Sequence, residues 1–289
     1  MNLIKSSLEN IRNLRKQKLN ELLFPCFGVF QERLIYGGTV YAFIENNEPV
    51  GYYIIKNSEI LDFYVKKEYD YFADECFCKA LEDLSCPVVN IRSDDSLLIN
   101  LVFNYLIDLE KGGYLLVRDR RHMLPEINNS SLHFSPLSMD ILEDSWKILS
   151  GGDSSYGAFG TQMEILQNSI DKDIYFCLLE NFTVTGIGYH QPVRNNCSEI
   201  RVIMDREYNN NEYAVLLLAE LARLVENKGY KCFAEISRFD TSDRKLMEEL
   251  GFYVIAKYFT ATIKGRIEDN TNKRRFNRRY SLTGLFKVL

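Results

Sequence analysis

The 289-residue sequence predicts an α/β protein with a mixed sheet, built from two related domains in tandem. An internal repeat, in which the same order of strand and helix patterns occurs twice about 140 residues apart, is the main evidence. Hydrophobic residues make up 46% and charged residues 26%, which is ordinary for a globular protein and excludes a disordered chain. The longest apolar runs fall far short of the ~20 residues that span a bilayer.

The evidence for the repeat is a set of short sequence matches whose separation along the chain changes slowly from one match to the next. Glu68-Tyr69 matches Glu207-Tyr208 139 positions later, and Gly51 matches Gly186 135 positions later. Loop insertions between two related domains produce such a drift, and copies of this length form domains rather than the ~20–45-residue units of a solenoid. The expected domains are residues 1–125 and 132–264, joined by a polar linker and followed by a basic tail at 265–289.

The first copy is expected to open with a helix from Leu3 to Leu23 and a Gly-containing loop, without an obvious opening strand. A polar turn at residues 46–49 between two apolar runs predicts a hairpin, and period-2 alternation after it predicts a third strand. The remaining pattern alternates amphipathic helix and strand. The expected elements are strands 40–45, 50–56, 60–65 and 88–92, helices 73–84 and 96–105, and a closing strand 114–118. Asp62 and the aspartates after it are expected on a solvated face.

The second copy repeats this order with clearer signals for where its helices start and stop. Apolar residues at 215, 218, 221, 222 and 225 predict an amphipathic helix, and Gly229 stands at its expected C-terminal cap. Ser242-Asp243 and Gly251 mark the start and stop of the next helix. The expected elements are helices 139–149, 213–227 and 241–250, strands 174–180, 184–191, 199–205 and 231–237, and a closing strand 253–264.

These segments resemble the GNAT superfamily of N-acetyltransferases. The residues that carry the resemblance are FCLLENFTVTGIGYH, EIRVIMDREYNNNEYAVLLLAELA and EISRFDTSDRKLMEELGFYV, and the closing Leu250-Gly251-Phe252 is typical of the family. Both copies together cover nearly the whole chain, so it looks like a tandem GNAT protein, as are the mycothiol synthases and the Fem-type aminoacyltransferases. The second copy lies closer to the family's pattern than the first, which is degenerate.

The resemblance implies that two parallel strands splay apart and that acyl-CoA lies in the gap like an added strand. The backbone of Val202 and Met204 would contact the pantetheine arm, and the N-terminus of the following helix would receive the pyrophosphate. The residues at that phosphate loop are Asn209, Asn210, Asn211, Tyr213 and Ala214. Only Ala214 fits the family's loop pattern, although an asparagine run can form an anion-binding turn. The acidic segment 70–75 argues against acyl-CoA binding in the first copy.

Acyl transfer to an amine needs a base, an oxyanion donor and an acid for the departing thiolate. Glu199 and His190 are the candidate bases, each with the alternative of an ordinary strand-end residue. The family's usual acid, a tyrosine, is replaced by Met247 and its usual asparagine by Asp240, which leaves Ser237, Tyr253 and Tyr258 as possible donors.

The Gly-rich loop at 150–162 offers hydroxyls and a carboxylate for substrate binding. Asp153, Ser155 and Tyr156 are the candidates, and a plain helix–helix connection is the alternative.

Several other site classes are excluded or disfavoured. No dinucleotide, P-loop or nucleophile-elbow motif occurs, and seven scattered cysteines with three histidines make a metal site unexpected. The N-terminus lacks a signal-peptide pattern, so a cytoplasmic protein with reduced thiols is expected. Residues 264–289 hold eight basic and two acidic residues, while the remainder is acidic and is a poor general nucleic-acid binder.

The sequence therefore predicts an acyl-CoA-dependent N-acyltransferase acting on an amine of a small molecule or peptide, with acetyl-CoA or another acyl-CoA as co-substrate. The alternative is a catalytically inactive GNAT pair that serves as a binding or regulatory module. The acidic body favours a cationic amine or basic peptide, whereas the basic tail could grip RNA or an anionic partner. Two fused copies can imitate a GNAT homodimer, which favours a monomer.

Overall fold

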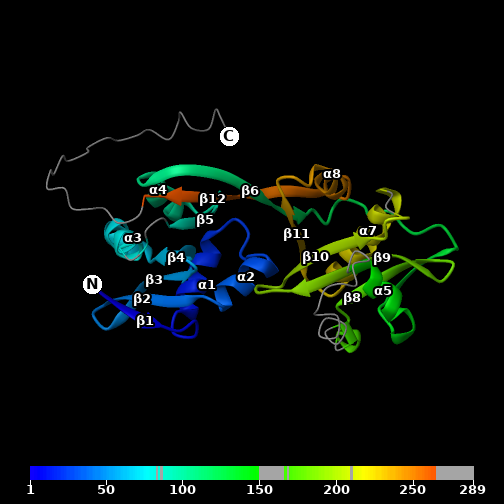
Figure 1. The fold of residues 1–289 in the computed structure, drawn as a ribbon, viewed down its shortest axis with the longest axis horizontal. Coiled ribbons are helices and arrows are strands. Elements are labelled where there is room, and N and C mark those ends of the chain that lie inside the picture. Colours follow the sequence, from blue (N-terminus) through cyan, green and yellow to red (C-terminus); the bar gives the residue numbers. More distant parts are fainter. Residues whose placement is uncertain (83, 85–86, 150–165, 168, 209–210, 265–289) are drawn as a thin grey trace.

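The computed structural model describes residues 1–82, 84, 87–149, 166–167, 169–208 and 211–264 (Figure 1). We call residues 1–118 the first half and residues 132–264 the second half. The first half contains β1 (Asn2–Ser6), α1 (Arg12–Glu21), α2 (Val29–Tyr36), β2 (Thr39–Glu45), β3 (Glu48–Lys56), β4 (Glu59–Val65), the 3₁₀ helix η1 (Lys67–Phe72), α3 (Ala73–Leu81), β5 (Val88–Arg92), α4 (Ser96–Phe103) and β6 (Leu106–Arg118). The second half contains β7 (Leu132–Pro136), η2 (Met139–Ile141), α5 (Leu142–Leu149), η3 (Ile170–Lys172), β8 (Tyr175–Glu180), β9 (Thr183–Pro192), β10 (Cys197–Met204), α7 (Asn211–Asn227), β11 (Lys231–Ser237), α8 (Thr241–Glu249) and β12 (Phe252–Ile263).

The α/β class, the mixed sheet and the repeated element order are confirmed. The two predicted hairpins form between β2 and β3 and between β8 and β9. Their tight turns place Asn46 and Asn47 at φ 51° and 65°, and Asn181 and Phe182 at φ 48° and 69°. Positive φ at both central residues is the type I′ geometry that matches the twist of paired strands.

Two expectations at the ends of the first half are wrong. Residues Asn2–Ser6 form a strand rather than the start of a helix, because they pair with β2 from Asn2↔Ile44 to Ser6↔Val40. The closing strand begins at Leu106 and not at Tyr114. Its first part is charged and largely exposed, so it lacks the pattern of a buried strand, and pairing with β12 alone makes it extended. Both errors arise because a strand partner outweighs local preference.

All strands in the described part of the chain belong to one 12-stranded sheet in the order β1-β2-β3-β4-β5-β12-β6-β11-β10-β9-β8-β7. The closing strands of the two halves have changed places (Figure 1). β6 of the first half pairs with β11, and β12 of the second half pairs with β5. β6 and β12 also pair with each other, from Leu106↔Ile263 to Arg118↔Phe252. Each half is therefore completed by a strand of the other.

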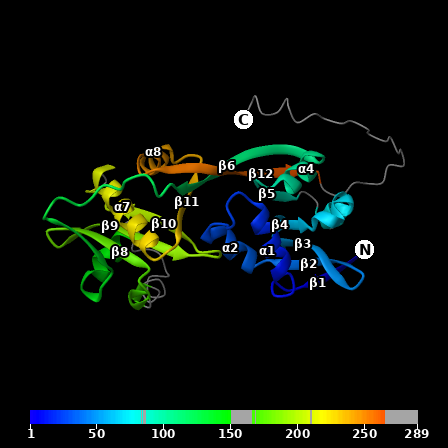
Figure 2. The ribbon, with the colours of Figure 1, turned by 180° about the vertical axis from the view of Figure 1, so that it is seen from behind.

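Helices cover both faces of this sheet, as Figure 2 shows from behind. In β3, Tyr53 packs in the cluster beneath α3 and α4, whereas its neighbour Tyr52 packs in the cluster beneath α1 and α2. In β8, Leu178 faces α7 and Cys177 faces α5 in the same way. Successive residues of a strand point to opposite faces, so each strand supplies two separate cores.

A fifth cluster joins the two halves. Phe24 and Cys26, from the loop between α1 and α2, are buried against Phe233 of β11 and Cys197 of β10. This loop of the first half therefore lies on strands of the second half, next to the point where β10 and β11 separate. No described helix is both long enough and apolar enough to cross a membrane.

The strand exchange predicts how fragments behave. Residues 1–125 and 132–264, expressed separately, should each fail to unfold cooperatively as a monomer, because each lacks the strand that completes its sheet. Co-expression should restore a one-to-one complex with the unfolding transition of the intact chain. Size-exclusion chromatography and urea denaturation measure both properties. A monomeric, cooperatively folded fragment as stable as the intact chain would contradict the prediction.

Candidate active site

The parallel strands β10 and β11 stay together only at their beginnings. They pair at Cys197↔Lys231, Ser198↔Cys232 and Glu199↔Phe233, and no further pair follows among the described residues. On its other side, β10 remains paired with β9 as far as Met204↔Gly186. The backbone edge of residues 200–204 that faces β11 is therefore left without a strand partner.

A cavity of about 620 Å³ opens in this gap, and we call it the splay cavity. Strand β10 contributes Val202 and Met204, and α7 contributes Ala214. The rest of the lining comes from Tyr189, Ile200, Arg201, Ile203, Leu218, Ala234, Glu235, Ile236, Asp240, Ser242, Asp243, Leu246 and Met247. The splay cavity thus brings together several residues that the sequence predicted at a cofactor site.

Helix α7 meets this cavity with its first turn. Ala214 is 6% exposed and lies in that turn, whereas Glu212 is exposed to solvent. Asn209 and Asn210 lie outside the described residues, as does the side chain of Asn211. Tyr213 does not line the cavity, because its hydroxyl donates to Glu180 Oε1 at 2.5 Å. The helix N-terminus still presents backbone N–H groups and the positive end of the helix dipole.

Two carboxylates, one fully buried and one half-buried, lie where β10 and β11 part. Glu199 is fully buried, and its Oε1 accepts a hydrogen bond from Arg201 Nε at 2.6 Å. Glu235, on β11, accepts a hydrogen bond from the Tyr258 hydroxyl. Burial and then the negative charge of Glu199 raise the pKa of Glu235. Burial and the Glu235 charge also raise the pKa of Tyr258, which keeps its hydroxyl protonated as a donor.

The first half holds both carboxylates through the N-terminus of α2. The backbone N–H of Val29 donates to Glu199 Oε2 at 2.6 Å, and that of Gly28 donates to Glu235 Oε1 at 2.9 Å. A Cβ atom at Gly28 would lie 2.0 Å from the Glu235 carboxyl group, so only glycine permits this approach. The carboxylates of one half are thus positioned by the backbone of the other.

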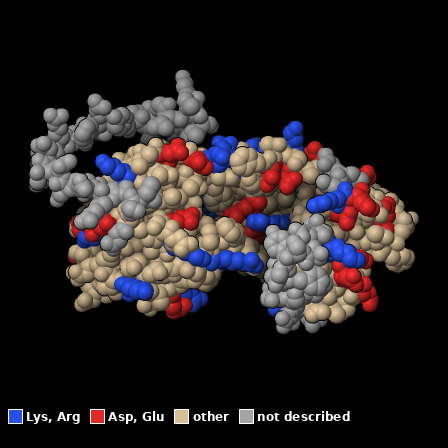
Figure 3. All heavy atoms as spheres, in the orientation of Figure 1, with Lys and Arg blue, Asp and Glu red and all other residues tan. Residues whose placement is uncertain are grey.

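A second cavity, of about 650 Å³, lies between the two halves, and we call it the interhalf cavity. The first half lines it with Phe27, Phe30 and Leu34, among others. Four residues line both cavities: Arg201, Glu235, Ile236 and Asp240. Figure 3 shows a hollow between the halves, with acidic and basic side chains next to each other inside it. The two cavities therefore meet at Glu235 and Asp240, whereas the fully buried Glu199 lies behind this junction and lines neither cavity.

His190 lies elsewhere. It is 2% exposed and lines neither cavity. Its Nδ1 is 3.2 Å from Ser198 Oγ and its Nε2 is 3.4 Å from Lys228 Nζ. Burial and the Lys228 charge lower the pKa of His190, which favours a neutral ring packed against Phe176.

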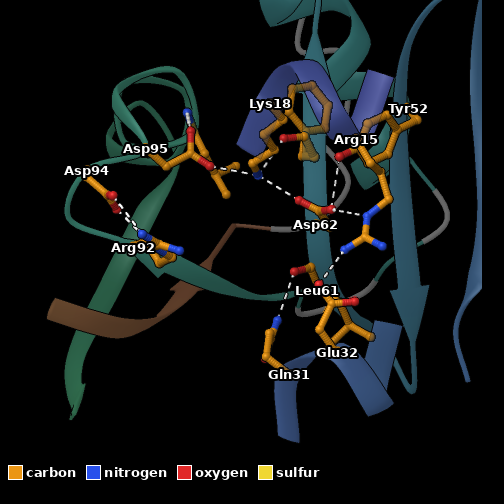
Figure 4. A network of polar contacts seen from close by, with 12 residues as sticks. Arg15, Lys18, Gln31, Glu32, Tyr52, Leu61, Asp62, Arg92, Asp94 and Asp95 are labelled. Atoms are coloured by element: carbon orange, nitrogen blue, oxygen red, sulfur yellow. Dashed lines mark hydrogen bonds and ion pairs between the residues drawn. The ribbon is translucent and has the colours of Figure 1, made fainter. Parts of the chain in front are cut away.

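The equivalent gap in the first half is filled by a lysine. Among the residues that the structure describes, β4 and β5 pair at Glu59↔Val88 and Ile60↔Val89 and nowhere else. Lys18 of α1 donates to the backbone oxygen of Phe63 at 3.0 Å and pairs with Asp62 at 2.6 Å and Asp95 at 2.7 Å (Figure 4). Gly51 in the first half pairs with Val65, and the equivalent Gly186 in the second half pairs with Met204. Phe63 and Val202 each lie two residues before these partners, so they occupy equivalent positions. The lysine therefore occupies an edge that stays free in the second half.

Asp62 lies at the centre of this network. The expectation that it is solvated is wrong, because it is buried. Its side chain is 1% exposed and also accepts hydrogen bonds from Arg15 at 3.3 Å and from the Tyr52 hydroxyl at 2.9 Å. Burial disfavours the charged carboxylate, but Lys18 and Arg15 outweigh burial and hold the pKa of Asp62 below its ordinary value. Arg15 extends the network to Glu32 of α2 at 3.1 Å.

The remaining predicted site residues differ in which cavity they line. Met247 lines the splay cavity, Ser237 and Tyr258 line the interhalf cavity, and Tyr253 lines neither. Asp153, Ser155 and Tyr156 lie outside the described residues. In the described part of the chain, no group of three or more His, Cys, Asp or Glu side chains could hold a metal ion.

Sequence reasoning missed Glu235, Gly28 and Val29. A single carboxylate inside the otherwise apolar run 232–236 was the available signal for Glu235, because a charge in a buried strand needs partners. Nothing in the sequence indicates that residues 28–29 would lie beside it, since the contacts span 170 and 207 positions.

Comparison with known proteins agrees with this geometry. Residues 7–119 match the family model described as an acetyltransferase (GNAT) domain. A GNAT-family acetyltransferase from Colwellia psychrerythraea superimposes with a TM-score of 0.78, covering 91% of this chain and 100% of that one at 11% identity. The chain has a tandem GNAT fold.

Other solved structures share the GNAT fold over most of this chain. A GCN5-related N-acetyltransferase from Sphaerobacter thermophilus has a TM-score of 0.62 at 12% identity and covers 92% of this chain and 97% of its own. A tandem GNAT protein from the clavulanic acid biosynthesis pathway has a TM-score of 0.57 at 9% identity and covers 90% and 97%. The family model matches the first half of this chain, although the phosphate-loop pattern is poorer there. No curated protein matches the chain.

The close approach at Gly28 gives a test of the contact between the halves. Gly28→Ala should lower the free energy of unfolding by about 1–3 kcal/mol, because the added methyl group must displace the Glu235 carboxyl group. Urea denaturation measures the change. Gly112→Ala is the matched control, since its Cβ would meet only ordinary contacts at 3.5 Å or more. Equal stability of the two variants would show that the Gly28–Glu235 contact is not tight.

Proposed function

We propose that the chain is an acyl-CoA-dependent N-acyltransferase with one active site, in the second half. The free edge of β10 beside the splay cavity is the observation that carries this proposal. The pantetheine arm of acyl-CoA can add to that edge as an extra strand, with the backbone of Val202 and Met204 as its hydrogen-bonding partners. The pyrophosphate would then lie at the N-terminus of α7, beside Ala214.

The fold is compatible with CoA binding in the splay cavity of the second half, and not in the equivalent gap between β4 and β5 of the first half. The splay cavity falls within the range of roughly 300–1,000 Å³ that is usual for small-molecule sites. In the first half, Lys18 holds the equivalent edge, and the residue corresponding to Ala214 is Glu75. A carboxylate at a helix N-terminus competes with a phosphate for the same N–H groups.

Glu235 and Glu199 are the proposed proton acceptors. An ammonium group that enters from the interhalf cavity reaches Glu235 at the junction of the two cavities, and loss of its proton frees the nitrogen lone pair for attack on the thioester. The raised pKa of Glu235 brings this carboxylate closer to the working pH than an ordinary glutamate. Glu199, held by Arg201 and Val29, lies beside it as the second carboxylate.

The positions of the cysteines favour direct attack of the amine on the thioester over an intermediate in which the acyl group is bound to a cysteine of the protein. No described cysteine lines either cavity. Burial raises the pKa of Cys177 to about 11, which disfavours the thiolate that a nucleophile needs. Acyl-CoA supplies the activated acyl group when bound. The backbone N–H of Met204 is the proposed oxyanion donor on this chain.

Calorimetry with CoA tests the location of the site. The chain should bind one CoA, and Ala214→Glu should weaken binding about a hundredfold, ~2.7 kcal/mol, by clash and charge repulsion. Glu75→Ala is the matched control at the corresponding position of the first half, and it should leave CoA affinity unchanged. Glu75 is a surface residue paired with Lys79. Two CoA molecules per chain, or unaltered affinity in folded Ala214→Glu, would contradict the assignment.

The pH dependence of turnover tests the base. A carboxylate with a raised pKa is protonated, and cannot accept a proton, below that pKa, so kcat/KM should fall as pH falls through a value above the ~4.3 of free glutamate. Glu235→Gln should lower kcat about a hundredfold or more and remove this acidic limb. Glu199→Gln is assayed beside it. Cys177→Ser and His190→Ala should keep the limb.

Two outcomes would change the assignment. Loss of the acidic limb in His190→Ala alone would make His190 the base. CoA binding without turnover by the parent chain would favour a binding or regulatory module.

A further inference from the structure

The lining of the interhalf cavity indicates which class of amine the protein accepts, and this inference rests on the proposed function. We propose that the acceptor is a primary alkylamine with an aromatic-sized apolar body and no carboxylate near the nitrogen. Its ammonium group binds between Glu235 and Asp240, and its body lies against Phe30 and Leu34. These residues surround the interhalf cavity from both halves of the chain.

The charges at the junction favour a cation. The basic residues that line the cavity already have acidic partners: Lys18 pairs with Asp62 and Asp95, Arg92 with Asp94 at 2.7 Å, and Arg201 with Glu199. Asp240 is exposed at the start of α8, and its carboxylate caps no backbone N–H and has no hydrogen-bond or ion-pair partner among the described residues. The junction therefore keeps unpaired negative charge, which attracts an ammonium group and repels a carboxylate.

The far side of the cavity favours an apolar body. Phe30 of α2 leaves 64% of its surface exposed while it lines the cavity. Leu34 lies one turn further along the same helix and also lines the cavity. Covering this surface with an aromatic or aliphatic group removes apolar area from water. A sugar amine would leave its hydroxyls facing the same apolar surface.

The experiment uses the full chain with three probes: phenethylamine, phenylalanine and glucosamine. Their binding is measured by calorimetry with CoA present, and their acetylation from acetyl-CoA is measured by release of the CoA thiol. Phenethylamine should bind at least about tenfold more tightly than either of the other two. Asp240→Asn should reduce its advantage over phenylalanine about fivefold or more, because the repulsion of the carboxylate is weakened.

Phe30→Ala separates the apolar contact from the charge. It should reduce the affinity for phenethylamine relative to ethylamine several-fold and leave CoA affinity unchanged, since Phe30 does not line the splay cavity. Phe103→Ala is the control, because this exposed phenylalanine of α4 lines neither cavity.

The outcomes separate the inference from the proposed function. Equal or tighter binding of phenylalanine or glucosamine would overturn the inference, as would an unchanged preference in Asp240→Asn or no binding of any amine. Preferential binding of phenethylamine without acetylation would support the amine site and overturn the proposed function.

Discussion

The exchange of β6 and β12 between the halves is the constraint on which the rest of the structure depends. β6 is hydrogen-bonded to β11 and β12 to β5, so the central strands of each half are fixed by the other. This pairing brings the loop before α2 onto β10 and β11, where Phe24 and Cys26 are buried. As a result, the amides of Gly28 and Val29 donate to Glu235 and Glu199, in addition to the donors that Tyr258 and Arg201 supply from the second half.

The two halves use the same splayed strands for different purposes. In the first half, Lys18 takes the hydrogen-bonding position on Phe63, and Asp62 and Asp95 balance its charge. A buried charge needs such partners, and Lys18 has two of them in Asp62 and Asp95. In the second half the corresponding edge is free and faces a cavity. One duplicated framework thus provides a closed half and an open half.

The residues predicted for the candidate site lie together only in part. The resemblance to the GNAT superfamily places Val202, Met204 and Ala214 around one gap, and the three residues line one cavity in the structure. Glu199 lies at the end of the β10–β11 pairing, as its place in the strand implies. His190 was expected at the same site, but the register opposite Ile200 directs it toward Phe176 and Lys228.

The sequence by itself determined the repeat, the fold class and most elements, because apolar periodicity and turn residues act over a few neighbouring positions. The gap where acyl-CoA is proposed to bind was expected only from the resemblance to the GNAT superfamily. Only the tertiary structure decided that the closing strands exchange, that Asn2–Ser6 is a strand, and that Lys18 closes one gap. It also brought Gly28 to Glu235. These features depend on hydrogen bonds and ion pairs between residues far apart in the chain, whose partners no local pattern specifies.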